Sequence, residues 1–222
     1  MKIYLVRHGE SESNVDKAVH LRKADHAINL GPNGLSQAEG VGKFLAQALK
    51  NNSWNGEINA RLWYSPYQRT KKTKDGILTA LKRDNMTFKF GCLEHPLLVE
   101  QQFGLFDGLS DDELKEQYPN EHAHYNKHQK FEGRFWARMP LGESRFDVAQ
   151  RVHQVFGTFH RDADRHGIET LVVVSHGVTI RAFIMMWLHR TVEWFEKEPN
   201  PKNCSIRLID NRQDCGYVIN GY

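Results

Sequence analysis

Near its start the chain reads Ile3-Tyr4-Leu5-Val6-Arg7-His8-Gly9. The apolar, β-branched and aromatic residues predict a short buried strand over 3–6, and Arg7-His8-Gly9 follows where that strand gives way to a turn. In open α/β sheets, ligands bind beyond the carboxyl ends of the strands, so these two basic side chains are placed to converge on an anion. The alternative is a surface turn that happens to carry two basic residues.

A second stretch with the same plan lies far away in the chain, at Thr170-Leu171-Val172-Val173-Val174-Ser175-His176-Gly177. It is again a strand without polar interruption, followed by His-Gly and by an amphipathic stretch that continues to Leu188. Two strands that are hydrophobic throughout indicate a parallel sheet covered on both faces. If the two strands are neighbours, His8 and His176 meet at one edge of that sheet.

The length allows one α/β domain or two small ones, and the absence of a boundary favours a single domain over residues 1–222 that carries an insertion. No Pro/Gly/Ser-rich linker and no block of like charges divides the 222 residues. The formal net charge of +3 is mild, and the basic residues are scattered among nearly as many acidic ones, so a nucleic-acid partner is not indicated. A small anionic substrate requires only a local basic pocket.

The sequence favours a cytoplasmic protein with no membrane partner. Its N-terminus lacks the pattern of a signal peptide, and no stretch approaches the roughly 20 apolar residues of a membrane span. The three cysteines, Cys92, Cys204 and Cys215, form no CxxC pair and are too few for a disulfide framework, so we expect reduced thiols. The oligomeric state cannot be read from these features.

Strands alternate with helices along the chain, which predicts a mostly parallel central sheet with helices on both faces. A capping box from Ser36 to Glu39 predicts a helix from about 36 to 50, and Ser65-Pro66 precedes a helix that carries Arg69. The other expected elements are a strand over 61–64, a possible strand over 88–90, a helix over 144–166 that ends at Gly167, and closing strands over 205–210 and 217–220, the last an antiparallel edge.

The residues from about 104 to 142 are polar, aromatic and irregular, which suits an inserted helical or loop lid. Within it, His122, His124 and His128 allow a zinc site, but no cysteine or well-spaced carboxylate completes the ligand set, so a solvated polar helix is favoured. The stretch 131–138 interleaves aromatic and basic residues. Nucleic-acid stacking is one interpretation, and a lid with Arg134 or Arg138 facing a substrate tail is favoured over it.

Five chemical groups fall at the carboxyl ends of strands or in the loops that follow: Arg7, His8, Arg69, Glu100 and His176. Arginine forks and a protonated histidine can neutralise the oxygens of a phosphoryl group in its transition state. The other histidine, if neutral, can attack phosphorus. A protonated glutamic acid can then donate its proton to the leaving oxygen. The set predicts phosphoryl transfer without a metal, because no carboxylate cluster for magnesium is evident.

Several blocks in this order resemble the histidine phosphatase superfamily, in its phosphoglycerate mutase-like branch. They are Leu5 to Ser11 with Asn14, Gly34-Leu35-Ser36 with Gln37, Ser65 to Thr70, Val99-Glu100 with Phe103-Gly104 and Gly108, and Val174-Ser175-His176-Gly177. The blocks span residues 1–181, so the match is far more specific than an isolated Arg-His-Gly. The fold implied is the phosphoglycerate mutase-like α/β fold.

The resemblance implies that His8 is the nucleophile, that Arg7, Asn14, Arg69 and His176 bind phosphate, and that Glu100 is the proton donor. His176 and Glu100 thus join His8 as catalytic residues, and the amide of Val178 is a further candidate contact. No P-loop or GxGxxG motif occurs, so neither a nucleotide cofactor nor any other cofactor is implied.

Three functions remain open for such a site. The favoured one is a metal-independent histidine acid phosphatase, which hydrolyses a small phosphorylated metabolite through a phosphohistidine. Mutase-type phosphoryl transfer is the alternative, although family mutases usually carry Asn after His-Gly, where this chain has Val178. A non-catalytic phospho-ligand binding protein is the third, because a fold does not ensure activity.

Overall fold

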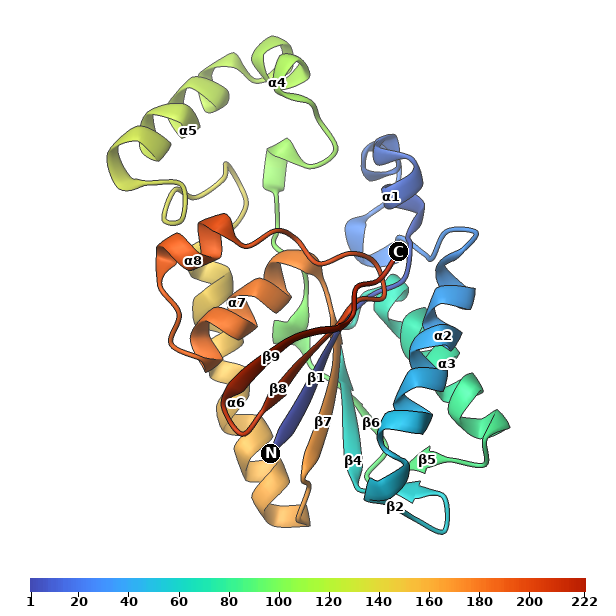
Figure 1. The fold of residues 1–222 in the computed structure, drawn as a ribbon. Helices are drawn as coiled ribbons and strands as arrows, with labels where there is room; N and C mark the ends of the chain where they lie inside the picture. Colours follow the sequence, from blue (N-terminus) through green and yellow to red (C-terminus); the bar gives the residue numbers. More distant parts are fainter.

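A six-stranded sheet forms the centre of the computed structural model, which describes all 222 residues (Figure 1). Its strands are β1 (Lys2–Arg7), β4 (Ala60–Tyr64), β6 (Cys92–Glu94), β7 (Thr170–Ser175), β8 (Ile206–Asp210) and β9 (Gln213–Ile219). They lie in the order β6-β4-β7-β1-β8-β9. A small second sheet has the order β2-β3-β5, with β2 at Ser53–Trp54, β3 at Glu57–Ile58 and β5 at Thr87–Phe88.

The pairing of β1 with β7 brings the two His-Gly turns together. The strands are parallel neighbours, and Arg7 lies opposite Ser175 at their carboxyl ends. β4 and β6 extend the parallel part of the sheet, whereas β8 and β9 are antiparallel to their neighbours. The predicted mostly parallel sheet with an antiparallel edge is therefore confirmed.

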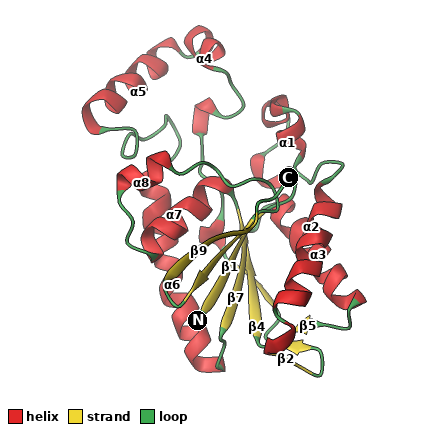
Figure 2. Ribbon diagram, viewed as in Figure 1, coloured by secondary structure: helices red, strands yellow, loops and turns green.

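Helices cover both faces of the sheet (Figure 2). The α-helices are α1 (Glu12–Val15), α2 (Gly34–Ala48), α3 (Gln68–Arg83), α4 (Asp111–Gln117), α5 (Pro119–Glu132), α6 (Arg145–His166), α7 (Gly177–Trp187) and α8 (Val192–Lys197). α2 and α3 lie on one face, and α6, α7 and α8 lie on the other. The loop between α1 and α2 carries two short 3-10 helices, Lys17–Leu21 and Asp25–Ala27.

Each face of the sheet has its own hydrophobic core. Alternate side chains of β1 point to opposite faces, so Ile3 and Leu5 pack with α6 and α7, and Tyr4 and Val6 pack with α2 and α3. Every residue of β7 is buried, as a strand with two covered faces requires. This double layer fixes the strand ends that carry the histidines.

Residues 104–142, here named the outer segment, leave the sheet layers and return to the same place. Leu105 donates its amide to the carbonyl of Pro140 at 3.1 Å. Gly104 has a φ of +60°, and a Cβ there would lie 2.1 Å from the same carbonyl, so a side chain has no room. Between these ends α4 and α5 stand apart from the sheet (Figure 1). No helix anywhere in the protein has the length and apolar character needed to cross a bilayer.

The helix expected from about 36 to 50 is confirmed as α2, but its predicted capping box was wrong. The helix begins at Gly34, and Ser36 donates its hydroxyl to the carbonyl of Asn33 instead of capping. The strand expected over 88–90 is shorter and belongs to the small sheet as β5, while β6 occupies the edge of the main sheet. The helix over 144–166 is confirmed, with a capping box from Ser144 to Asp147 and Gly167 in the left-handed conformation.

Candidate functional site

His8 is held by backbone contacts on both sides of the turn after β1. Its amide donates to the carbonyl of Ser175 at 3.0 Å, and its carbonyl accepts from the amide of Cys204 at 3.2 Å. The next residue has to be glycine because a Cβ at Gly9 would lie 2.5 Å from the carbonyl oxygen of Gly34. The strand end and this close approach leave the His8 ring only 4% exposed.

One hydrogen bond determines the tautomer of His8. Nδ1 lies 2.7 Å from the carbonyl oxygen of Gly9. A carbonyl can only accept, so Nδ1 carries the proton and Nε2 has the free lone pair in the neutral ring. The ring therefore presents an unprotonated Nε2, the atom that a nucleophilic histidine needs.

His176 lies beside His8, with the ring centroids 5.2 Å apart. It is fully buried, and both of its ring nitrogens have protein partners. Nδ1 accepts from Nε of Arg69 at 3.3 Å, and Nε2 lies 2.8 Å from the hydroxyl of Ser65. Because Nδ1 is an acceptor, the neutral ring carries its proton on Nε2 and donates to Ser65.

The surroundings of both histidines favour the neutral ring. Burial lowers the pKa of His8 well below its ordinary value, and the charges of Arg69 and Arg7 lower it further. Burial also lowers the pKa of His176 well below its ordinary value, with Arg69 as the next cause. These surroundings favour the uncharged ring of His176, whereas a protonated histidine was expected from the sequence, and a bound dianion would shift its pKa the other way.

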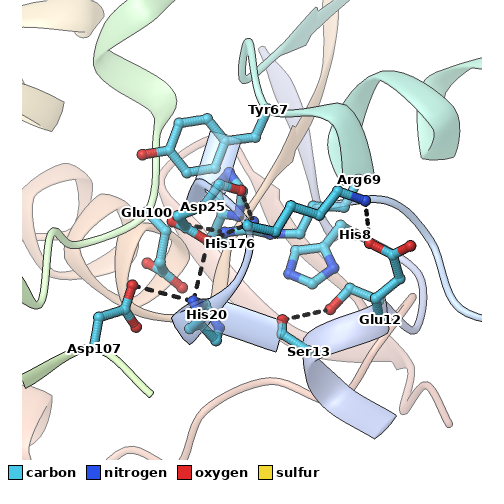
Figure 3. A network of polar contacts seen from close by, with 12 residues as sticks. His8, Glu12, Ser13, His20, Asp25, Tyr67, Arg69, Glu100, Asp107 and His176 are labelled. Carbon is cyan, nitrogen blue, oxygen red and sulfur yellow. Dashed lines mark hydrogen bonds and ion pairs between the residues drawn. The ribbon is translucent and has the colours of Figure 1, made fainter. Parts of the chain in front are cut away.

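Arg69 stands at the start of α3, and all of its nitrogens have partners (Figure 3). Besides Nε, which donates to His176, Nη1 donates to the carboxylate and to the carbonyl of Asp25, each at 2.8 Å. Nη2 donates to the other carboxylate oxygen of Asp25 at 3.3 Å. The ring of Tyr67 packs on the guanidinium at 4.8 Å, and burial raises the pKa of Tyr67 to about 12. This nearly buried cation is neutralised by one acid that the sequence did not single out.

Glu100 sits at the N-terminus of α7 and accepts from several donors. Its carboxylate receives the amide of Thr179 at 3.3 Å and the amide of Val178 at 3.4 Å. The Val178 amide, expected as a phosphate contact, is thus paired with Glu100. Arg151 holds the chain before Glu100 by donating to the carbonyls of Leu97, Val99 and Glu100 at 2.8 to 3.0 Å. These contacts fix the acid at the edge of the pocket.

A pocket of about 700 Å³ opens beside these groups. Its lining includes five of the predicted site residues, Arg7, His8, Asn14, Arg69 and Glu100, whereas the buried His176 lies behind it. The oxygen of Asn14 accepts from Ser11 and from Asn203, which holds the side chain at the wall. The opposite wall comes from Phe103 and from the outer segment, with Phe106, Asp107, Gly108, Leu109, Ser110 and Glu113.

The two arginines of the outer segment do not reach this pocket. Arg138 is exposed and pairs with Asp147 at 2.6 Å. Arg134 lines a separate, smaller hollow beside α8. The prediction that either faces a substrate tail is wrong for this pocket, because neither residue lines it. Lys17 and His20 supply the basic groups of the pocket mouth instead.

The predicted polar helix around His122 is confirmed as α5, although His122 is buried instead of solvated. Its Nε2 pairs with Asp111 at 2.8 Å, while the ring centroids of His124 and His128 lie 4.3 Å apart with the ring planes tilted by 50°. The single group of three close metal-type ligands is a different one, formed by His20, Asp25 and Asp107. All three already serve in ion pairs with protein groups.

Four residues that shape the site were not predicted from the sequence. Ser65 was visible only as part of Ser65-Pro66, yet its hydroxyl orients His176. Asp25, His20 and Asp107 lie in loops without a periodic pattern, and nothing in the sequence shows that they meet. Their proximity depends on how two long loops fold over the strand ends.

The fold and the paired histidines at its strand ends define an α/β protein of the histidine phosphatase fold. α-Ribazole phosphatase from Shigella flexneri aligns with a TM-score of 0.70 at 18% identity, over 100% of this chain and 96% of that one. A mycobacterial glucosyl-3-phosphoglycerate phosphatase aligns with a TM-score of 0.66 at 18% identity, over 100% and 98% of the two chains.

The sequence itself matches the model of the histidine phosphatase superfamily (branch 1) over residues 3–220, and the chain belongs to this family. It is 35% identical to the phosphoglycerate mutase-like protein AT74 of Arabidopsis thaliana, covering 98% of this chain and 67% of that protein. It is 24% identical to the broad-range acid phosphatase DET1 of Saccharomyces cerevisiae, covering 94% and 84% of the two proteins. The resemblance inferred from the motifs is therefore confirmed.

Proposed function

We propose that this protein is a phosphatase that hydrolyses a small phosphorylated metabolite through a phosphohistidine on His8. The observation that carries the proposal is the tautomer of His8, whose Nδ1 is tied to Gly9 so that Nε2 is free beside Arg7 and Arg69. Relatives named as phosphatases, DET1 and a second yeast protein called a broad-specificity phosphatase, support hydrolysis as the reaction.

In the first step Nε2 of His8 attacks phosphorus, and the bond from phosphorus to the ester oxygen breaks. The leaving oxygen takes a proton from the carboxylic acid of Glu100. Arg7 and Arg69 neutralise the charge that spreads over the phosphoryl oxygens, and a dianion at this point favours protonation of His176. Asn14 adds a polar contact at the pocket wall.

In the second step water attacks the phosphorus of the phosphohistidine. Glu100, now a carboxylate, accepts a proton from this water, and the electron pair of the broken N–P bond returns to Nε2. Transfer to a second substrate instead of water would give a mutase. We propose that the outer segment acts as a lid of a single domain and admits water to this intermediate.

The direct test is covalent labelling. The wild type, incubated with a ³²P-labelled metabolite and quenched in alkali, is expected to carry acid-labile phosphate. His8→Ala is expected to carry none, and His128→Ala, a matched change on the exposed face of α5, is expected to label normally. Equal labelling of His8→Ala would refute the assignment of the nucleophile.

Two further assays separate the alternatives. Rapid isomerisation of 3-phosphoglycerate in the presence of 2,3-bisphosphoglycerate, without release of phosphate, would establish the mutase. Binding of phosphate without any labelling or release across a panel of phosphorylated metabolites would establish a binding protein. The same panel, assayed for release, identifies the substrate, and activity in a chelator tests the predicted metal independence.

A further inference from the structure

The anion partner of Arg69 in this structure is a carboxylate of the protein. Asp25 contacts Nη1 and Nη2 of Arg69 through its two oxygens, which is the bidentate geometry that an arginine also uses for phosphate. Arg69 is only 4% exposed, so water cannot solvate its charge and the protein must supply an anion. In the free pocket, Asp25 therefore occupies the fork that a phosphate would need.

Asp25 lies outside the sheet and the long helices that carry the histidines and Arg69. It begins the short 3-10 helix Asp25–Ala27 in the loop between α1 and α2, while Arg69 is anchored in α3. The side chain of Asp25 is 23% exposed and lines the pocket. A change of its side-chain torsions removes the carboxylate from Arg69 without moving the sheet or α3, while the backbone carbonyl of Asp25 keeps its bond to Nη1.

A second basic side chain, that of His20, lies beside Asp25. Nδ1 of His20 lies 3.8 Å from Oδ1 of Asp25 and 3.1 Å from Oδ2 of Asp107 (Figure 3). The hydrogen bond to Asp107 raises the pKa of His20, and the charge of Asp25 acts in the same direction, whereas burial and Arg69 act against them. Asp107 belongs to the outer segment, so a charged His20 links Asp25 to that wall of the pocket.

We propose that Asp25 is a built-in competitor for the phosphate position on Arg69, and that His20 receives its carboxylate when phosphate binds. The inference rests on the proposed function, since it assumes that Arg69 grips phosphate. The free protein keeps Arg69 neutralised and oriented toward His176 through Asp25. Binding exchanges one anion for another on Arg69, and the displaced carboxylate moves toward His20 and Asp107.

The exchange has a signature that a purely structural role lacks. Removing the carboxylate of Asp25 strengthens phosphate binding, because phosphate then has no competitor on Arg69. Removing His20 weakens phosphate binding, because the displaced carboxylate of Asp25 then has no partner. A partly exposed ion pair of this kind is worth up to about fivefold in affinity. The opposite signs of the two changes, more than their size, distinguish competition from simple support of the pocket.

The experiment measures the dissociation constant of inorganic phosphate by calorimetry, in a chelator so that no cation sits on His20, Asp25 and Asp107. We expect Asp25→Asn to bind phosphate about fivefold more tightly than the wild type and His20→Gln to bind it about fivefold more weakly. Glu39→Gln is the matched control. Glu39, on α2, forms an ion pair with Arg83, which lies on the same helix as Arg69 but away from the pocket. It is expected to bind as the wild type does.

Weaker or unchanged binding by a folded Asp25→Asn would overturn the inference and would make Asp25 a plain counter-ion. Tighter binding by His20→Gln would overturn the receiving role of His20. Circular dichroism and thermal unfolding show whether each variant is folded, and Asp25→Ser provides a second way to remove the charge. Failure of the wild type itself to bind phosphate would instead refute the proposed function.

Discussion

The two sides of the pocket are built in different ways. The inner side, at the carboxyl ends of β1 and β7, holds His8 through backbone bonds and His176 and Arg69 through buried side-chain bonds. The outer side belongs to residues 104–142 and meets the rest of the pocket through side chains, chiefly the pair of Asp107 with His20. The groups that carry out the proposed chemistry thus lie at the ends of sheet strands and helices. The groups that would meet the variable part of a substrate lie on the outer segment, whose two ends are hydrogen-bonded to each other.

The largest expected effect distinguishes the loss of a catalytic group on the inner side from a change in substrate binding on the outer side. His8→Ala removes the only atom positioned to form the N–P bond, so we expect turnover to fall by on the order of a thousandfold or more. Phe106→Ala changes the outer wall, where Phe106 packs on Tyr125 at 5.3 Å, and should mainly raise KM. Steady-state kinetics on both variants test this contrast. Comparable losses of kcat would show that the outer side also takes part in the chemistry.

The next effect concerns the cation of the inner side. Arg69→Ala is expected to lower turnover by on the order of a hundredfold, because one preorganised donor to the transition state is lost. Arg83→Ala is the matched control on the same helix, where the arginine is exposed and pairs with Glu39. Turnover of both variants is measured with the same substrate. If Arg69→Ala keeps full activity, Arg69 has no part in binding phosphate.

The residues of the inner side could be predicted from the sequence because their positions follow from the ends of strands. Two uninterrupted apolar runs, each followed by His-Gly, predict parallel neighbours, and parallel neighbours place His8 beside His176. Arg69 followed from the Ser-Pro start of a helix. Local patterns and simple sheet geometry were sufficient for these groups.

The contacts of the outer side could not be predicted from the sequence in the same way. The contact of His20 with Asp107 joins residues from two loops without any repeat in their sequence, and the direction of Arg138 depends on how α5 and the following turn pack. The interpretation that put Arg134 or Arg138 at the substrate failed for this reason. Side chains in long loops are placed by tertiary packing, which a sequence pattern does not encode.

A smaller effect follows from the buried neutral histidines. In the unfolded chain His8 and His176 take up protons near pH 6.5, but burial lowers the pKa of both in the folded protein. Each therefore contributes stability that is complete above about pH 6.5 and is lost as the pH falls toward the lowered pKa, by up to about 1.4 kcal/mol per pH unit.

Denaturant unfolding at several pH values tests this expectation. His8→Gln should flatten the loss of unfolding free energy below about pH 6.5, because Gln does not titrate. His128→Gln, at a partly exposed position outside the pocket, is the matched control and should leave the slope unchanged. An unaltered slope in His8→Gln would mean that the ring of His8 is charged, or free to become charged, in the folded protein.

The smallest expected effect tests the corrected view of the outer side. Arg138 is 67% exposed and pairs with Asp147, so Arg138→Ala should change kcat and KM by less than about twofold. Lys17→Ala is the informative partner, since Lys17 lines the pocket mouth, and loss of its charge should raise KM for an anionic substrate by about two- to fivefold. Added salt should shrink that difference, because exposed charges are screened. A larger effect from Arg138 than from Lys17 would show that Arg138 turns toward the substrate when the outer segment meets it, and the outer wall described by Phe106, Asp107 and Lys17 would then be incomplete.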